Sequence, residues 1–162
     1  MPKIRHPSKK QLEKILAGEP VDPARSALMA RVRGKNSKPE IVVRRVAHAL
    51  GYRFRLHRGN LPGTPDLVFS RLRKVIFVHG CFWHRHRGCS RTTTPKTRAA
   101  FWAEKFARNI ERDALKASQL KALGWKVLIV WECETFNPDI LSGDLAAFLA
   151  FRRQRARREL RK

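Results

Sequence analysis

Acidic residues are scarce in this chain: it has 13 Asp and Glu against 36 Lys and Arg, which leaves a formal net charge of +23. A folded domain this basic repels itself unless a polyanionic partner neutralises it. Nucleic acid is the common partner, because phosphate contacts release counterions and dominate affinity. Charge alone does not separate DNA from RNA, or an enzyme from a binding module, and a ribosome-associated protein has a similar balance.

Long apolar runs and paired cysteines are also missing. Runs such as Val127–Trp131 are far shorter than the roughly 20 residues that span a bilayer. The start, Met1–His6, has no apolar segment of a secretory signal, which predicts an intracellular protein. In a bacterium, we expect it in the cytoplasm, associated with the nucleoid. Three cysteines are an odd count in a chain without an export signal, which argues against a disulfide framework. Metal ligation or simple burial of the thiols remains.

The two ends of the chain are predicted to be accessories to one central domain, because 162 residues are enough for a single sizeable core. We predict a basic N-terminal extension over residues 1–25, the central domain over 26–136, and a basic helix over 137–162 that packs on or extends that domain. A short helix over 8–16 and a Pro/Gly break over 18–23 fall near the first end, and the basic run Arg152–Arg158 falls near the second.

Apolar periodicity predicts the elements of the central domain. Ser37 is a candidate N-cap, followed by Pro39 in the first turn and Glu40 at the capping-box position. The expected order is a helix over 37–50, strands over 52–57, 66–69 and 75–78, a loop over 79–96, a helix over 97–123, a strand over 127–131 and a helix from 139. Along one side of the second helix, apolar residues repeat at Phe101, Phe106, Ile110, Leu115 and Leu120. This order predicts an α/β fold with a mixed central sheet flanked by helices.

Asp66 is the first candidate for chemistry. It follows a Pro-containing turn at the mouth of a strand, where a carboxylate can bind Mg²⁺, a cation that takes few protein oxygens together with water and phosphate. The neighbouring strand ends at Val78 and can offer a backbone carbonyl, and Glu40 could complete the site directly or through water. A lone Pro-Asp pair, however, more often only caps a turn.

The loop after Val78 concentrates metal-binding side chains. Cys81, His86 and Cys89 form a cluster, and Cys133 lies just past the strand over 127–131, so a Cys3His group would use every cysteine in the chain. Zinc takes four such ligands tetrahedrally, and a structural site would fold a loop too polar to form its own core. The alternative is buried free thiols among solvated histidines.

Two histidines and three aromatic residues remain around this loop. A neutral imidazole is a natural base for activating a water molecule that attacks phosphorus, so His84 is a candidate general base and His79 a candidate for orienting metal-bound water. Either could instead contact phosphate or solvent. Phe82 and Trp83 lie among arginines, as stacking or wedging residues do, whereas Trp102 taken alone fits ordinary core packing better.

Four spaced motifs resemble the very-short-patch repair (Vsr) mismatch endonucleases. The similarity covers about residues 26–134 and is carried by Leu61–Asp66, Val75–His84, Arg108–Asp113 and Gly124–Cys133. It implies a restriction-endonuclease-like fold of the PD-(D/E)xK type with a structural zinc loop. It also implies an enzyme that nicks DNA 5′ of the thymine in a T:G mismatch, the product of 5-methylcytosine deamination. The expected partners are mismatched double-stranded DNA and mismatch-repair proteins, with the enzyme as a monomer.

The resemblance also implies roles for individual residues. Asp66 and the Val78 carbonyl would bind Mg²⁺, Glu40 and His79 would hold water on that metal, and His84 would be the general base. The zinc ligands and the residues that wedge into DNA would be two further sets: Cys81, His86, Cys89 and Cys133 for zinc; Phe82, Trp83 and Trp102 for DNA.

The chain departs from the family pattern at two places. Val78 stands where the family often has Thr, which a backbone ligand would tolerate, and His86 and Cys89 are one residue further apart, so the loop must bulge around Gly88. Two rival functions remain. A nickase of the same fold with another specificity would cut matched DNA, and a non-catalytic zinc-containing module would bind DNA without Asp66 and His84.

Overall fold

A mixed sheet in the order β1-β2-β3-β4 forms the centre of the computed structural model, which describes residues 23–31 and 34–150. The strands are β1 (Arg55–Leu56), β2 (Leu67–Phe69), β3 (Lys74–His79) and β4 (Lys126–Trp131). The first three strands pair antiparallel, whereas β3 and β4 are parallel and are joined by the long helix α5 (Ala99–Ala122). The sheet confirms the predicted α/β arrangement of a mixed sheet flanked by helices.

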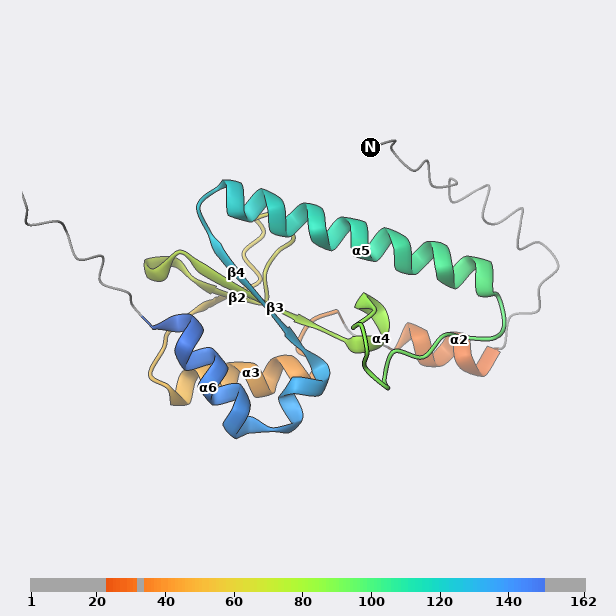
Figure 1. Cartoon of the computed structure of the whole chain (residues 1–162), viewed down its shortest axis with the longest axis horizontal. Helices are drawn as coiled ribbons and strands as arrows, with labels where there is room; N and C mark the ends of the chain where they lie inside the picture. The colour runs from red at the N-terminus through yellow and green to blue at the C-terminus, as the bar shows by residue number, and fades with distance from the viewer. Residues whose placement is uncertain (1–22, 32–33, 151–162) are drawn as a thin grey trace, which may run out of the picture.

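Helices cover both faces of the sheet (Figure 1). Helices α3 (Lys38–Ala49) and α6 (Pro138–Leu149) lie on one face, and α5 crosses the other. Successive strand residues point to opposite faces, so Leu67 and Ile76 join the core beneath α3 and α6, while Val68 and Val75 pack with Leu120 of α5. Two apolar cores therefore hold the strand ends in place between helices.

Local capping explains where the two helices on the first face begin. The hydroxyl oxygen of Ser37 accepts a hydrogen bond of 3.4 Å from the N–H of Glu40, which confirms Ser37 as the N-cap of α3. The side chain of Asn137 accepts 3.2 Å from the N–H of Ile140 at the start of α6. Helix α6 then buries Leu141, Leu145 and Leu149 in the core shared with α3, so residues up to 149 pack on the same domain.

Three details differ from the sequence-based expectation. The predicted strand over 52–57 is reduced to Arg55–Leu56, because only these two residues pair with β2 and His57, with a φ of 46°, leaves the extended conformation. The predicted loop over 79–96 contains a one-turn helix, α4 (Cys81–His84). Ile110 and Leu115 of α5 are 50% and 52% exposed, whereas Phe106 and Leu120 are buried. At 3.6 residues per turn Leu115 lies on the opposite side of the helix from Phe106, so the buried face is narrower than predicted.

The remaining elements are α2 (Pro23–Ala30), η1 (Ser70–Leu72) and η2 (Glu132–Phe136). Three predicted segments lie outside the described residues: the helix over 8–16, most of the break over 18–23 and the basic run Arg152–Arg158. The predicted boundaries after residues 25 and 136 therefore stay predictions. Among the described helices, none combines the length and the apolar character needed to cross a membrane.

Candidate active site and metal centres

Asp66 stands where the turn over 61–65 enters β2, and its side chain is only 17% exposed. Its Oδ2 atom accepts a hydrogen bond of 2.7 Å from the N–H of Val78 on β3. Burial raises the pKa of Asp66 to about 6; the Val78 hydrogen bond opposes this rise, and the negative charge of Glu40 adds to it. A carboxylate that is costly to ionise beside a second carboxylate favours a bound cation.

Glu40 completes a carboxylate pair with Asp66. It is 2% exposed on α3, forms an ion pair with Arg44 one turn later, and lies 2.9 Å from Nε2 of His57. Nδ1 of His57 lies 3.8 Å from Oδ1 of Asp66. One ligand atom from each of Glu40, His57 and Asp66 fits within a 4.8 Å group. The structure therefore brings the two predicted acids together, with an imidazole between them.

Sequence reasoning missed His57 and Arg44 as members of this group. His57 ends an alternating stretch and has a φ of 46°, a left-handed conformation that few non-glycine residues adopt and that clusters at functional sites. Nothing in its strand-like surroundings reveals this conformation. Arg44 could have been found, because a basic residue four positions after Glu40 on a helix lies on the same face.

His79 and His84 stack face to face, with ring centroids 3.9 Å apart and planes 13° from parallel. Burial, together with the charge of His84, lowers the pKa of His79 to about 4, so this imidazole is neutral at pH 7. Nδ1 of His84 forms a hydrogen bond with a carboxylate oxygen of Asp113 on α5. Burial acts to raise the pKa of Asp113, but the bond to His84 and neighbouring positive charge leave it below its usual value.

Asp113 is an acid that sequence reasoning did not assign to the site. Its signal was the helical spacing to Asn109, which places both side chains on one face of α5. Asn109 donates a hydrogen bond of 3.0 Å to the backbone oxygen of Trp83, next to His84. That face of α5 therefore fixes both the α4 turn and the His84 ring.

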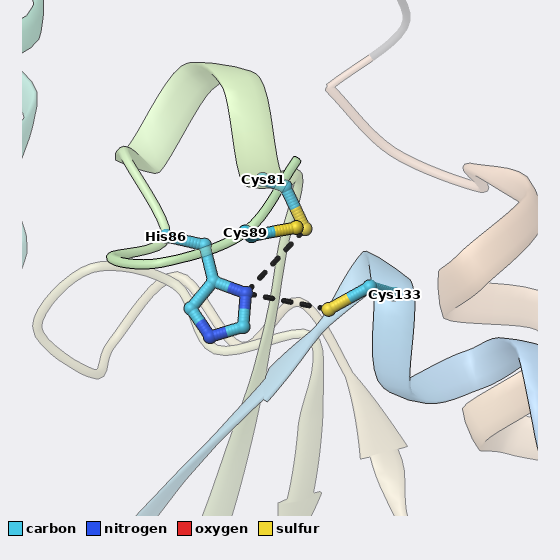
Figure 2. A group of neighbouring side chains, drawn as sticks. All are labelled: Cys81, His86, Cys89 and Cys133. Carbon is cyan, nitrogen blue, oxygen red and sulfur yellow. Dashed lines mark hydrogen bonds between the residues drawn. The ribbon is translucent and has the colours of Figure 1, made fainter. Parts of the chain in front are cut away.

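Cys81, His86, Cys89 and Cys133 converge as predicted, although they come from α4, the loop after it and η2 (Figure 2). Nδ1 of His86 lies 3.7 Å from Sγ of Cys81 and 3.3 Å from Sγ of Cys133. Zinc with bonds of about 2.1 Å to nitrogen and 2.3 Å to sulfur would hold tetrahedral ligands about 3.6 Å apart. The four side chains therefore fit a zinc ion.

The turn around Gly88 accommodates the extra residue between two of these ligands. Gly88 has a φ of 76°, and the N–H of Cys89 donates 3.3 Å to the backbone oxygen of His86. Burial raises the pKa of the Cys81 thiol to about 12, whereas a backbone hydrogen bond at Arg91 lowers the pKa of Cys89. Without a cation, therefore, the buried thiol of Cys81 holds its proton.

The three predicted DNA-contacting aromatics form one cluster with Phe106. The ring of Phe82 lies 5.1 Å from that of Trp83 and 5.5 Å from that of Trp102, centroid to centroid. Phe82 and Trp83 are partly exposed, but Trp102 is only 7% exposed. In this conformation the buried Trp102 packs against both Phe82 and Trp83, and Lys105 lies over the Trp83 ring at 5.1 Å.

Two cavities meet at this site and share Gly34, Asp66, Val78 and His84. The larger, of about 760 Å³, also reaches His79 and Asp113. The smaller, of about 500 Å³, is bounded by Glu40, Trp83, Lys105 and Asn109, among others. Asp66 and His84 line both cavities, so the carboxylate pair and the His84–Asp113 pair face two adjoining cavities. This arrangement suits a metal-assisted hydrolysis with a histidine base.

Comparison with known proteins points to DNA. The sequence model described as DNA mismatch endonuclease Vsr matches residues 21–91. The type II nicking enzyme V.XorIIP of Xanthomonas oryzae pv. oryzae is 54% identical over 125 residues, which are 77% of this chain and 91% of that protein. The type II nicking enzyme V.NmeAIP of Neisseria meningitidis serogroup A is 40% identical over 72% of this chain and 82% of its own length. The DNA mismatch endonuclease Vsr of Escherichia coli is 53% identical over 83 residues, which are 51% of this chain and 53% of that enzyme.

Proposed function

The chain belongs to the Vsr DNA mismatch endonuclease family, and we propose that it nicks one strand of duplex DNA 5′ of the thymine in a T:G mismatch. Membership makes it a DNA endonuclease, a hydrolase of phosphodiester bonds. One observation carries the proposed mechanism: the Asp66–Glu40 carboxylates and the His84–Asp113 pair meet where two adjoining cavities share Asp66 and His84, in a chain of net charge +23. Such a nick would initiate very-short-patch repair of deaminated 5-methylcytosine.

The carboxylate pair would hold the catalytic cation. Asp66 and the Val78 carbonyl would supply the hard oxygen ligands that magnesium prefers. Burial and the charge of Glu40 make the Asp66 carboxylate costly to ionise, and a bound cation would offset that cost. When bound, magnesium supplies positive charge that stabilises the phosphate in the transition state. Arg44 and His57 fix Glu40 in position. Glu40 and the neutral His79 would orient water in the cleft.

His84 would act as the general base. A carboxylate can only accept a hydrogen bond, so the contact with Asp113 assigns the proton to Nδ1 of His84 and leaves Nε2 to take the proton of the attacking water. Asp113 then stabilises the imidazolium ion that forms. Stacking on the neutral ring of His79 restricts rotation of the His84 ring. A base with a fixed tautomer and orientation is what proton transfer in a confined site requires.

The Cys3His group would bind structural zinc. Four protein ligands leave no open coordination position, so zinc would not take part in hydrolysis. Phe82, Trp83 and His84 lie between the ligands Cys81 and His86 in the sequence. Bound zinc would therefore fix the positions of the base and of both partly exposed aromatic residues.

The aromatic cluster would provide the preference for a mismatch. Phe82 and Trp83, supported by Trp102, would wedge between base steps beside the thymine. A T:G wobble pair costs less to unstack than a matched pair, so the wedge favours the mismatch.

A nickase with another specificity is the second candidate. It is favoured by the names of V.XorIIP and V.NmeAIP, which describe type II nicking enzymes and mention no mismatch. A non-catalytic zinc module is the third, and it requires that Asp66 and His84 be dispensable.

A strand-resolved nicking assay separates these functions. The substrate is a duplex with one T:G pair in magnesium buffer, compared with the same duplex carrying T:A, and with Asp66→Ala and His84→Ala enzymes on the mismatch. We expect a single nick 5′ of the thymine, at least tenfold slower on matched DNA and lost in both variants, because a general base alone contributes about 10²-fold or more. Equal cutting of matched DNA supports the nickase, and binding without any cut supports the non-catalytic module.

A further inference from the structure

The larger cavity is lined by basic side chains that the proposed chemistry does not use. Lys35, Arg112 and Lys116 lie on its wall, and the acids among its described lining residues are Asp66 and Asp113, both assigned to the reaction. Arg112, which also contacts Asp113 at 3.4 Å, and Lys116 are one helical turn apart on α5, and Lys35 precedes α3. Positive charge from two separate segments therefore faces one side of the site.

Lys116 is held against the turn that positions Asp66. A Cβ atom added to Gly63 would lie 3.0 Å from Cβ and 3.2 Å from Cγ of Lys116, so the aliphatic stem packs directly on this turn. Gly63 has a φ of 76°, in the region that glycine adopts without strain. Among the described residues, the Nζ atom of Lys116 contacts Oε1 of Gln119 at a long 3.4 Å. The stem of Lys116 is thus fixed relative to Asp66, while its ammonium group keeps donors for a ligand.

The residues that line the two cavities indicate which part of the DNA strand each cavity would bind. They meet at Asp66 and His84, and the smaller one is bounded by Trp83 of the aromatic cluster. If that cluster wedges beside the thymine, and the cut lies 5′ of the thymine, the smaller cavity takes the strand 3′ of the cut. The larger cavity then takes the strand on the 5′ side.

We propose that Lys116, assisted by Arg112 and Lys35, forms a subsite for the DNA backbone phosphate immediately 5′ of the cut. The direction rests on the proposed function, whereas the phosphate contact rests on the basic wall of the cavity. Holding the phosphate next to the cut would fix the strand on both sides of the reacting phosphorus, which favours in-line attack.

The test measures DNA binding without magnesium, as a function of salt, for the full chain. Lys116→Met keeps the stem that packs on Gly63 and removes the charge, and Lys116→Arg restores a cation. Lys121→Met is the matched control, because Lys121 is exposed on the same helix and does not line either cavity. We expect Lys116→Met to weaken binding about tenfold, the effect of one hydrogen bond to a charged group. It should also reduce the slope of log affinity against log salt by about 0.9.

A second series replaces single phosphates by neutral methylphosphonates on either side of the mapped nick. With the phosphate immediately 5′ of the nick neutralised, Lys116→Met should cost less than about twofold, since its partner charge is already gone. With the phosphate on the 3′ side neutralised, the tenfold loss should persist. Lys116→Arg and Lys121→Met should behave like the wild type throughout.

Two results would overturn the subsite: a Lys116→Met enzyme with unchanged affinity and salt slope, or a loss that is independent of which phosphate is neutral. A loss that disappears only with the 3′ phosphate would overturn the direction. Equal nicking of matched and mismatched DNA by the wild type would instead refute the mismatch proposal, and because phosphates are counted from the mapped nick, the subsite would still be measured.

Discussion

Nδ1 of His84 donates a hydrogen bond to a carboxylate oxygen of Asp113, and this contact joins the α4 turn to the middle of α5. The two residues are 29 positions apart in the sequence. The contact sets the tautomer of His84. Among the histidines of the described site, His84 is the one that lines both cavities, and its Nδ1 has a carboxylate partner.

Asp113→Asn should therefore slow the chemical step. The amide keeps the size of the side chain but can present its NH₂ group to His84 and cannot stabilise an imidazolium ion, so we expect kcat to fall about 10²-fold, near the lower limit for general-base catalysis. Single-turnover nicking across pH 6–9 measures this, together with DNA binding, which should hold within a factor of two.

The matched control is Asp144→Asn, which removes an exposed acid from α6 away from both cavities. An Asp113→Asn enzyme as fast as this control would refute the assigned role of Asp113.

Asp66→Asn should stabilise the fold in the absence of magnesium. The pKa of Asp66 is raised from 3.8 to about 6, so the folded protein binds the proton more tightly than the unfolded chain. Stability from the protonated carboxyl is present at low pH and is lost as the pH rises through about 4 to 6. Above pH 6 a neutral Asn avoids the cost of the buried charge, roughly 1–3 kcal/mol.

Urea unfolding at pH 4.5 and pH 7.5 measures this effect, in buffer without magnesium and without a chelator that would remove zinc. The gain should be present at pH 7.5 and small at pH 4.5. A variant that is less stable than the wild type at pH 7.5 would show that burial does not penalise the Asp66 carboxylate.

Zinc removal should unfold the catalytic loop. Purified protein should contain about one zinc per chain, and Cys133→Ala should lose it, because three remaining ligands bind more weakly. Elemental analysis and thermal unfolding measure the two effects. His48→Ala, at an exposed histidine of α3, is the control. Full zinc content in the Cys133→Ala protein would remove Cys133 from the ligand set.

Trp83 and Trp102 should separate recognition from stability. Trp102 is buried in the cluster, so Trp102→Ala should cost about 3–5 kcal/mol of unfolding free energy, as for other buried aromatics. Trp83 is partly exposed, so Trp83→Ala should cost much less but reduce the rate ratio between T:G and T:A substrates. The same ratio in Trp83→Ala and wild-type enzymes would exclude Trp83 from mismatch recognition.

Much of the fold followed from local pattern. Ser37 and Pro39 begin α3, Gly51 follows its end, and the apolar run over 75–78 forms the central strand, because capping and side-chain periodicity act over a few residues. The Cys3His group could also be predicted from the sequence, since three of its members lie within nine positions and only one other cysteine exists in the chain.

The sequence by itself determined the charge, the element order, the clustered ligands and the candidate acid and base. Only the tertiary structure decided which of these side chains meet: His57 leaves the strand at a φ of 46° to contact Glu40, Asp113 reaches His84 from another helix, and Trp102 is buried. The physical reason is range. Capping and periodicity are properties of neighbouring residues, whereas burial, pKa shifts and contacts across the sheet depend on where α3, α5 and β3 pack.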